Sequence, residues 1–220
     1  MMQGVTETLF YFNMNEFDIK AAVWDSNLMH VDRAGTIAGR ILTRIPLNPS
    51  MKALEYGAGT GLASFFLRDS LKEVAMMDNS PEMVRIMNEK VNSSGSANLK
   101  AVCFDLEKNE LNNENFDLIF TIMVLHHVSD VGLITKKFFR ILNPGGYIAI
   151  ADLYPEDGSF HGNGFTGHKG FDPEALSSLL KNNGFSDISH EKSYVINKKV
   201  SGSETKQFDV FLLTAKKPAN

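Results

Sequence analysis

The sequence lacks several features that would place it in a specialised class. It has one cysteine, Cys103, among 220 residues, so no disulfide can form within the chain. Its longest strongly apolar run, residues 118–125, is far shorter than the roughly 20 residues that a membrane-spanning helix needs. Residues 1–12 show no basic stretch followed by an apolar one. We therefore expect no signal peptide, no membrane contact and a cytoplasmic location.

A surplus of basic residues is also missing. The formal net charge is -4 at pH 7, whereas proteins that grip nucleic acid through its phosphates carry excess positive charge. The sequence shows no internal repeat and no long low-complexity tract. Hydrophobic residues make up 43% and charged residues 22%, which are ordinary values for a globular protein. These properties predict a folded protein whose partner is not nucleic acid.

The spacing of apolar residues predicts the fold class. Residues 15–45 are apolar at helical intervals, and Pro46 ends that segment. Strands are predicted at residues 51–56, 73–77, 100–104, 116–121, 147–151, 186–196 and 206–215, helices at 61–70, 81–93, 131–142 and 172–183, and a sharp turn at 143–146. This alternation predicts a doubly wound α/β fold with a seven-stranded, mostly parallel sheet. In such sheets ligands bind beyond the carboxyl ends of the strands.

A glycine-rich loop follows the first predicted strand. Residues 55–61 read Glu-Tyr-Gly-Ala-Gly-Thr-Gly, which permits a tight turn and a close approach of the backbone to a ligand. The loop opens into a helix, whose first N–H groups favour an anionic group. Leu62 stands where a dinucleotide fingerprint needs glycine, and no Gly-Lys-Ser/Thr of a P-loop follows. Taken alone, the loop is also compatible with a plain connection between strand and helix.

Acidic residues end the next two predicted strands. Asp78 stands where a carboxylate accepts hydrogen bonds from ribose hydroxyls in related sheets, although it also precedes the helix that begins at Pro81. Asp105 follows the third strand and is placed to accept from an adenine amino group, or it simply starts a loop. A glycine loop and two acids at three neighbouring strand ends together predict a nucleoside-binding site.

With these residues the sequence resembles the class I S-adenosylmethionine (SAM)-dependent methyltransferases, and among them the small-molecule members of the type 11/12 group. The matching segments are residues 54–61, 77–83, 104–106, 116–119 with 125–128, and 142–148. Residues 17–25 are also similar to a lead-in, Phe-Asp-x-x-Ala-x-x-Trp-Asp, of small-molecule members. The resemblance implies that the last strand, residues 208–215, runs antiparallel and that N-terminal helices cover the cofactor.

The resemblance also implies a role for each residue of the cofactor site. The residues that would hold the methionine end of SAM are Glu55, Gly57, Ala58, Gly59 and Gly61. Asp78 would bind the ribose hydroxyls and Asn79 would lie next to the adenine. Asp105 and Leu106 would bind the edge and face of that ring, and the backbone after Thr121 would help to place the sulfonium.

We expect one SAM-dependent methyltransferase domain over residues 1–220. Its parts would be a helical cap (1–49), a cofactor-binding core (50–152), a lid insertion (153–170) and the C-terminal part of the sheet (171–220). The predicted lid has glycines around Phe160, Phe165 and Phe171, and loops of this length without regular structure are often functional. Closing it would exclude water from the sulfonium.

Histidines supply the candidate bases. His126 and His127 follow the fourth strand, and His161 and His168 lie in the predicted lid. If the acceptor must lose a proton, His127, His161 or His168 is the candidate catalytic residue. Each is equally compatible with a packed ring or a surface loop. The spacing of the four matches no known ligand pattern, so we expect no metal site.

Aromatic residues of the predicted cap are candidates for contact with the cofactor. Phe10, Tyr11, Phe12 and Trp24 can stack on it or attract the sulfonium through their ring faces, or they can serve as ordinary core.

Missing motifs narrow the acceptor. The Asp/Asn-Pro-Pro-Tyr/Phe sequence of many nucleic-acid and protein methyltransferases is absent after the fourth strand, where residues 122–125 read Ile-Met-Val-Leu. The several cysteines of arsenic methyltransferases and of cysteine-using RNA methylases are absent too. We therefore expect a small-molecule acceptor. The alternatives are a protein or RNA methyltransferase working with a partner, a non-catalytic SAM-binding protein, and an NAD-type oxidoreductase. The sequence sets neither the acceptor atom nor an oligomeric state.

Overall fold

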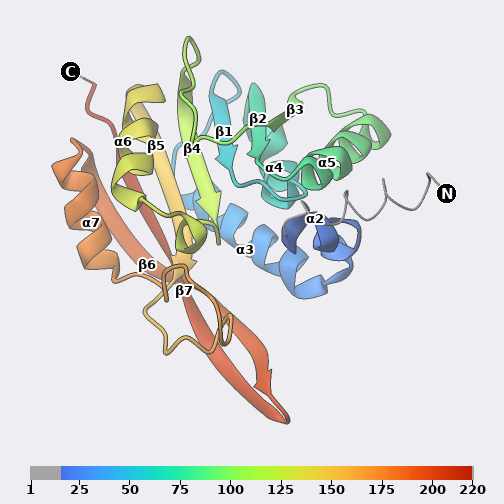
Figure 1. The fold of residues 1–220 in the computed structure, drawn as a ribbon. Helices are drawn as coiled ribbons and strands as arrows, with labels where there is room; N and C mark the ends of the chain where they lie inside the picture. The colour runs from blue at the N-terminus through green and yellow to red at the C-terminus, as the bar shows by residue number, and fades with distance from the viewer. Residues whose placement is uncertain (1–15, 220) are drawn as a thin grey trace.

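In the computed structural model, which describes residues 16–219, a twisted sheet separates two layers of helices (Figure 1). The strands are β1 (Lys52–Tyr56), β2 (Glu73–Asp78), β3 (Leu99–Cys103), β4 (Phe116–Ile122), β5 (Leu142–Leu153), β6 (Ser186–Ser201) and β7 (Glu204–Lys216). Their order is β3-β2-β1-β4-β5-β7-β6, and only β7 runs antiparallel to its neighbours. The predicted fold class is therefore confirmed, including the direction of the last strand.

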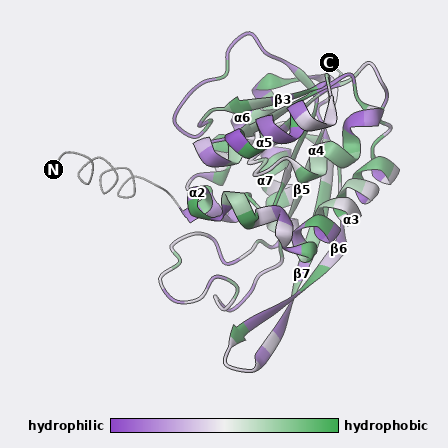
Figure 2. Ribbon diagram, turned by 90° about the vertical axis from the view of Figure 1, so that its right-hand side faces the viewer, coloured by the Kyte–Doolittle hydropathy of each residue, from purple (hydrophilic) through white to green (hydrophobic). Residues whose placement is uncertain are grey.

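The helices divide into two groups by the core that they share with the sheet. The helical elements are α2 (Glu16–Lys20), η1 (Ala21–Ser26), α3 (Leu28–Arg44), α4 (Leu62–Leu67), η2 (Arg68–Ser70), α5 (Pro81–Ser94), η3 (Leu125–His127), α6 (Val131–Ile141) and α7 (Pro173–Asn182). Buried side chains of α3, α4 and α5 pack on one sheet face, and those of α6 and α7 on the other. Hydrophobic segments concentrate in these layers (Figure 2).

Local signals explain where the helices begin. Ser80 and Asp172 cap α5 and α7 with side-chain hydrogen bonds, and a proline occupies the first turn of each. The helical segment predicted at residues 15–45 is divided into α2, η1 and α3, because Asn27 leaves the helical conformation and its side chain caps α3. Phe10, Tyr11 and Phe12, which we considered as cofactor contacts, lie outside the described residues.

The sheet departs from the prediction mainly at β5. This strand begins at Leu142, so the turn predicted at residues 143–146 lies within it as an irregularity. Phe116 pairs with Leu142 but Leu118 pairs with Tyr147, and Gly145 takes a φ of 80° in the bulged segment. The β6–β7 pair is longer than predicted and projects beyond the rest of the sheet (Figure 1). No helix of the described part of the chain is long and apolar enough to cross a membrane.

Candidate active site

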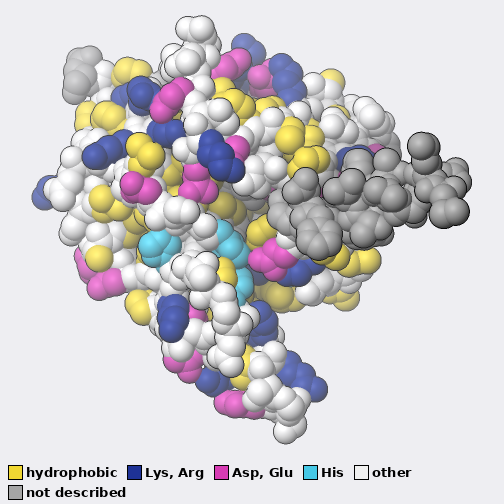
Figure 3. Space-filling view, viewed as in Figure 1, with side chains coloured by type: hydrophobic (Ala, Val, Ile, Leu, Met, Phe, Trp, Pro, Cys, Tyr) yellow, Lys and Arg dark blue, Asp and Glu magenta, His cyan; other side chains and the backbone are white. Residues whose placement is uncertain are grey.

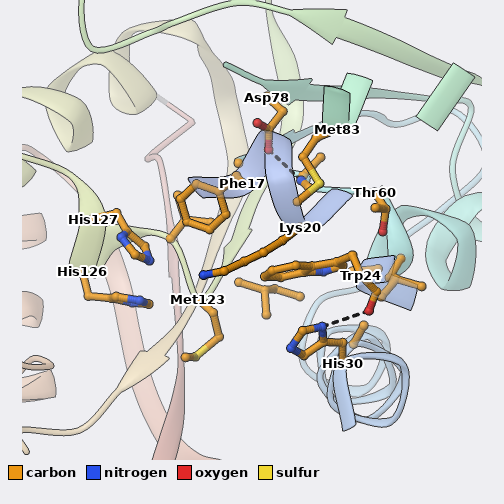
Figure 4. Close-up of a pocket in the computed structure, with 18 of the residues that line it drawn as sticks. Phe17, Lys20, Trp24, His30, Thr60, Asp78, Met83, Met123, His126 and His127 are labelled. Carbon is orange, nitrogen blue, oxygen red and sulfur yellow. Dashed lines mark hydrogen bonds between the residues drawn. The ribbon is translucent and has the colours of Figure 1, made fainter. Parts of the chain in front are cut away.

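A cavity of about 870 Å³ lies at the carboxyl ends of the parallel strands. The cover helices α2, η1 and the start of α3 form one wall, and the segments after β1, β2, β3 and β4 form another. Phe160 and His161, from the loop between β5 and α7, and residues 196–199 of β6 complete the lining. Its size lies within the range of small-molecule sites. Figure 4 shows side chains from the cover helices and from the strand ends pointing into one space.

The glycine loop after β1 forms the floor of this cavity. Gly57, Gly59 and Gly61 have φ values of 68°, 57° and 80°, which L-residues with side chains rarely adopt. A Cβ atom on Gly57 would lie 2.5 Å from the methyl groups of Val124, and one on Gly61 would lie 2.7 Å from Met76 Sδ. Glycine is therefore required here by packing as well as by conformation, and Ala58 lines the cavity between them.

Glu55 lies beneath the loop and is almost completely buried. Its carboxyl group accepts hydrogen bonds from the backbone N–H and the hydroxyl of Ser64 in α4. Burial raises the pKa of Glu55 to about 8, against the hydrogen bonds from Ser64, which lower it. At neutral pH the apoprotein therefore holds Glu55 mostly protonated, next to the space where the glycine loop faces the cavity.

The acids at the ends of β2 and β3 both line the cavity, as predicted, but each is also used by the protein itself. Asp78 accepts from Gly59 N at 2.7 Å and from Ser80 N at 2.9 Å, so it fixes the glycine loop and the start of α5. Asp105 accepts from the backbone N–H groups of Glu107 and Lys108 and pairs with the Lys108 ammonium at 2.8 Å. Each carboxylate keeps further lone pairs for a ligand.

Three more predicted positions surround these acids. Asn79 is exposed and Leu106 is buried, and both line the cavity. The segment after β4 enters the cavity at Met123, whose φ of 61° is unusual for a residue with a side chain. Met123 N is held there by the carbonyl of Ala151 in β5 at 2.8 Å. Such local strain is often found at functional sites.

The lead-in motif of residues 17–25 fastens the cover helices to the core. Asp18 accepts from the Ser80 hydroxyl at 2.5 Å, at the start of α5. Asp25 accepts from the Thr60 hydroxyl at 2.5 Å and pairs with Lys90 at 2.7 Å. The two aspartates therefore join the cover to the start of α5 and to the glycine loop. This connection places Trp24 in the cavity wall, where its ring lies 4.2 Å from that of His30 (Figure 4).

Arg33 in α3 is a site residue that the sequence reasoning missed. Its residue exposure is 8%, it lines the cavity, and its Nε has no hydrogen-bond partner among the described residues. Nη1 makes a weak hydrogen bond to Met29 Sδ at 3.7 Å. Burial lowers the pKa of Arg33 to about 10, which leaves it charged at neutral pH. The helical period, which sets Arg33 on the same face as the buried Ile37 and Ile41, could have revealed it.

Histidines gather at the opposite end of the cavity from the glycine loop. His126 and His127, from η3, and His161, from the loop after β5, have ring centroids 4.2 to 5.0 Å apart. The space-filling view shows histidine side chains (cyan) grouped beside the loop after β5 (Figure 3). Burial, followed by the proximity of His126, lowers the pKa of His127 and of His161 to about 4. Both rings are therefore uncharged at neutral pH.

His168, the third candidate base, does not lie among the lining residues. Its Nε2 donates to the carbonyl of Val128 at 3.0 Å, and its backbone N–H donates to the carbonyl of His126 at 2.8 Å. These two bonds fasten the loop after β5 to η3 and to the residue that follows it. Asp152 is buried against His126, while Asp157 pairs with Lys206 on the surface.

Comparisons with known proteins agree with this geometry. Residues 54–150 match the family described as a methyltransferase domain. An uncharacterized methyltransferase of Schizosaccharomyces pombe is 30% identical over 148 residues, which are 60% of this chain and 52% of that protein. The chain thus spans about half the length of this curated relative.

Solved structures share the fold. One chain of a complex containing the Haloferax volcanii Trm112 methyltransferase activator has a TM-score of 0.74 at 19% identity, with 93% of this chain and 98% of that chain covered. Phosphoethanolamine N-methyltransferase 2 of Haemonchus contortus, in complex with S-adenosyl-L-methionine, has a TM-score of 0.66 at 18% identity, with 94% and 61% covered. Together with the strand order, the methyltransferase domain matched at residues 54–150 and the relatives support a class I SAM-dependent methyltransferase, and the solved structures share its fold.

Proposed function

We propose that this protein transfers a methyl group from SAM to a small-molecule acceptor. The observation that carries the proposal is the shape of the site. One cavity runs from the glycine loop to the histidines, beneath the cover helices and the loop after β5. A cofactor and a small acceptor can share such a space, whereas a macromolecular acceptor would need an open, charged face. When bound, SAM supplies a methyl group whose bond to sulfur breaks as its bond to the acceptor forms.

The residues present fit this cofactor. A Cβ atom on Gly59 would meet no atom of the described residues nearer than Trp24 Nε1 at 3.9 Å, so the glycine loop leaves open space toward the cavity at this position. We assign Glu55, Gly57, Ala58, Gly59 and Gly61 to the methionine end. We assign Asp78 and Asn79 to the ribose and adenine, and Asp105 with Leu106 to the adenine, by their places at neighbouring strand ends.

Arg33 extends this assignment. A buried guanidinium with no carboxylate in hydrogen-bond contact among the described residues costs free energy, because its desolvation is only partly offset by the electrostatic influence of Tyr194 and Asp152. It lines the cavity from α3, in the wall that the cover helices form. We assign it to a carboxylate of the bound cofactor, whose charge would compensate that of Arg33.

The chain itself contributes alignment and exclusion of water. Phe17, Trp24 and Phe160 surround the cavity with apolar surface, which favours a dry, fixed arrangement of the two reactants. His127 and His161 stay our candidates for the proton acceptor, since both line the cavity in the neutral form. A base with a pKa of about 4 is weak, so this role suits an acceptor that loses its proton readily. His168 would serve by holding the loop after β5.

A second candidate function is methylation of a protein or RNA by a complex with an activator. The fold similarity to a chain of the Trm112-containing complex is the observation that favours it. The absence of a basic surplus argues against RNA. Activity on small acceptors by the isolated chain would support the first proposal, and activity that requires an added activator protein would support the second.

The first experiment is calorimetric titration with S-adenosylhomocysteine, with NADH as the control ligand. We expect micromolar binding that Asp78→Ala and Arg33→Met each weaken by about tenfold or more, roughly 1.4 kcal/mol each. NADH should give no heat of binding. Failure of the wild-type chain to bind S-adenosylhomocysteine would contradict the cofactor assignment, and binding of NADH in its place would favour the oxidoreductase alternative.

A further inference from the structure

The three histidines at the acceptor end of the cavity form a closed triangle. Each ring of His126, His127 and His161 contacts the other two, and one nitrogen from each lies within 4.8 Å of the others. Figure 4 shows His126 and His127 projecting into the cavity from the same short segment. His161 arrives from a loop more than thirty residues later. Spacing along the sequence gave no sign of this convergence.

The hydrogen bonds of the triangle leave ring nitrogens of His126 and His161 available to a ligand. His126 Nδ1 donates to the carboxylate of Asp152 at 2.6 Å, and both residues are buried. In the neutral form of His126 this bond places the proton on Nδ1, so the Nε2 lone pair can bind a metal ion. His161 Nε2 is buried and has no partner among the described residues. A carboxylate behind a histidine with a free second nitrogen is the usual support of a metal ligand.

Aromatic rings surround the triangle, as apolar side chains surround many metal sites. Phe165 stacks on His161 at 3.9 Å, Phe17 meets His127 edge-on at 5.2 Å, and Phe160 lies 4.9 Å from His161. These rings shield the nitrogens from bulk water, and an apolar shell of this kind controls solvent access to metals.

Charges around the triangle are balanced. Glu16 and Asp152 face it with negative charge, and Lys20 and Lys198 with positive charge. Lys20 pairs with Glu16 at 2.6 Å, and Lys198 donates to the carbonyl of Phe160. The charge of Lys20 is therefore neutralised by Glu16. The carboxylate of Asp152 would oppose the positive charge that Lys198 adds near a bound dication.

We propose that His126, His127 and His161 bind one divalent transition-metal ion, with Zn²⁺ as the probe of choice, and leave a fourth position open toward the cavity. Three neutral imidazoles with one open position are a ligand set of catalytic zinc sites. Tetrahedral zinc with bonds of about 2.0–2.1 Å needs the nitrogens about 3.4 Å apart, so the rings would turn inward on binding. His168 is not a ligand, since its Nε2 is bound to Val128.

The position of the ion would give it a role in the proposed reaction, and this consequence rests on the proposed function. A hydroxyl or thiol of the acceptor bound at the open position would lose its proton to solvent more readily, because the ion stabilises the resulting anion. The oxygen or sulfur would then attack the methyl carbon. The metal would thereby replace His127 and His161, which are weak bases, in activating the acceptor.

The test is titration of the chain with Zn²⁺ in the absence of cofactor and acceptor. The protein carries no histidine tag and is freed of metal with a chelator beforehand. We expect one equivalent bound, and at least tenfold weaker binding by His127→Ala and by His161→Ala. Asp152→Asn should weaken binding about 10- to 100-fold, as loss of such supporting carboxylates does. His190→Gln, which alters a histidine paired with Glu174 outside the cavity, should bind like wild type.

Co²⁺ provides a second readout that depends on geometry. Wild type should give the visible absorption of tetrahedral Co²⁺, and His161→Ala should lose it while keeping the wild-type circular dichroism and melting temperature. The proposal is overturned if wild type binds no stoichiometric Zn²⁺, or if the cavity variants bind as tightly as wild type. Because no cofactor is present, either result leaves the methyltransferase proposal to be judged by binding of S-adenosylhomocysteine.

Discussion

At the scale of single residues, the site contains ionisable groups that the protein buries at a cost. Arg33 is a buried cation whose Nε has no hydrogen-bond partner within residues 16–219, and Glu55 is a buried acid whose pKa is raised. Neither arrangement is what stability alone would favour, since buried polar groups normally find partners. Both residues line the same cavity, so a bound ligand offers a common physical reason for them.

Glu55 makes stability depend on pH in a defined direction. Its folded-state pKa of about 8 lies above the ordinary 4.5, so the folded protein binds a proton that the unfolded chain releases between these values. The stabilisation is therefore complete below about pH 4.5 and is lost as pH rises through about 8. We expect the free energy of unfolding of the apoprotein to fall from pH 5 to pH 9 by more than that of Glu55→Gln. Urea denaturation at several pH values measures this.

Glu204→Gln is the control for that comparison, because Glu204 is exposed on the β6–β7 hairpin. Its pH dependence should match that of wild type. A Glu55→Gln curve parallel to the wild-type curve over the whole range would show that Glu55 ionises normally in the folded protein.

At the scale of elements, the contacts that hold the glycine loop also hold the short cover helices over the cavity. The loop is fixed from three sides, by Asp78 at Gly59, by Asp25 at Thr60, and by Val124 against Gly57. α2 and η1 are short, and short helices are marginal in isolation, so their hydrogen bonds to Ser80 and Thr60 hold them over the cavity. The cover is thus coupled to the loop that it encloses.

Two glycine substitutions distinguish the packing requirement of the glycine loop from the general effect of replacing glycine by alanine in a helix. Gly57→Ala should destabilise the fold by about 1–3 kcal/mol from conformational strain, and by more if Val124 cannot move, and it should weaken S-adenosylhomocysteine binding at least tenfold. Gly39→Ala, in the exposed part of α3 with no atom within 4 Å of the new methyl group, should stabilise by about 0.5–1 kcal/mol without changing that binding. Thermal melting and calorimetry report both effects, and equal behaviour of the two variants would refute the packing argument.

At the scale of the whole molecule, the cavity exists only in the folded chain. Its lining comes from residues 16–34, 55–63, 77–83, 104–107, 122–128, 160–161 and 196–199. These segments meet because the parallel strands all present their carboxyl ends at one edge, while α2, η1 and β6 close around it. A ligand of the cavity therefore binds the folded state and not the unfolded one.

This dependence predicts a shift in thermal stability. At a free S-adenosylhomocysteine concentration of about 100 times Kd, the folded state should gain about 2.7 kcal/mol. For a chain of this size the melting temperature should then rise by about 5–10 °C, and NADH at the same concentration should leave it unchanged. Differential scanning fluorimetry measures the shift. An unchanged melting temperature with ligand at that excess would contradict a site assembled by folding.

Local patterns in the sequence determined the sheet, its helices and the location of the cofactor loop. Apolar spacing marks strands and helices directly, Ser80 and Asp172 mark helix starts, and the glycines of residues 57–61 mark a turn that needs positive φ. These signals act between near neighbours, so one sequence is enough to reveal them. The irregular start of β5 was missed because it depends on the pairing of β4 with β5.

Only the tertiary structure decided the chemistry at the far end of the cavity. The triangle of His126, His127 and His161 and the carboxylate of Asp152 behind it come from different elements, and their meeting depends on how those elements pack. His168 lies in the same glycine-rich segment as His161, but its ring bonds to the carbonyl of Val128. Residue type and spacing could name the candidates, but the path of the chain through space selects which of them share one site.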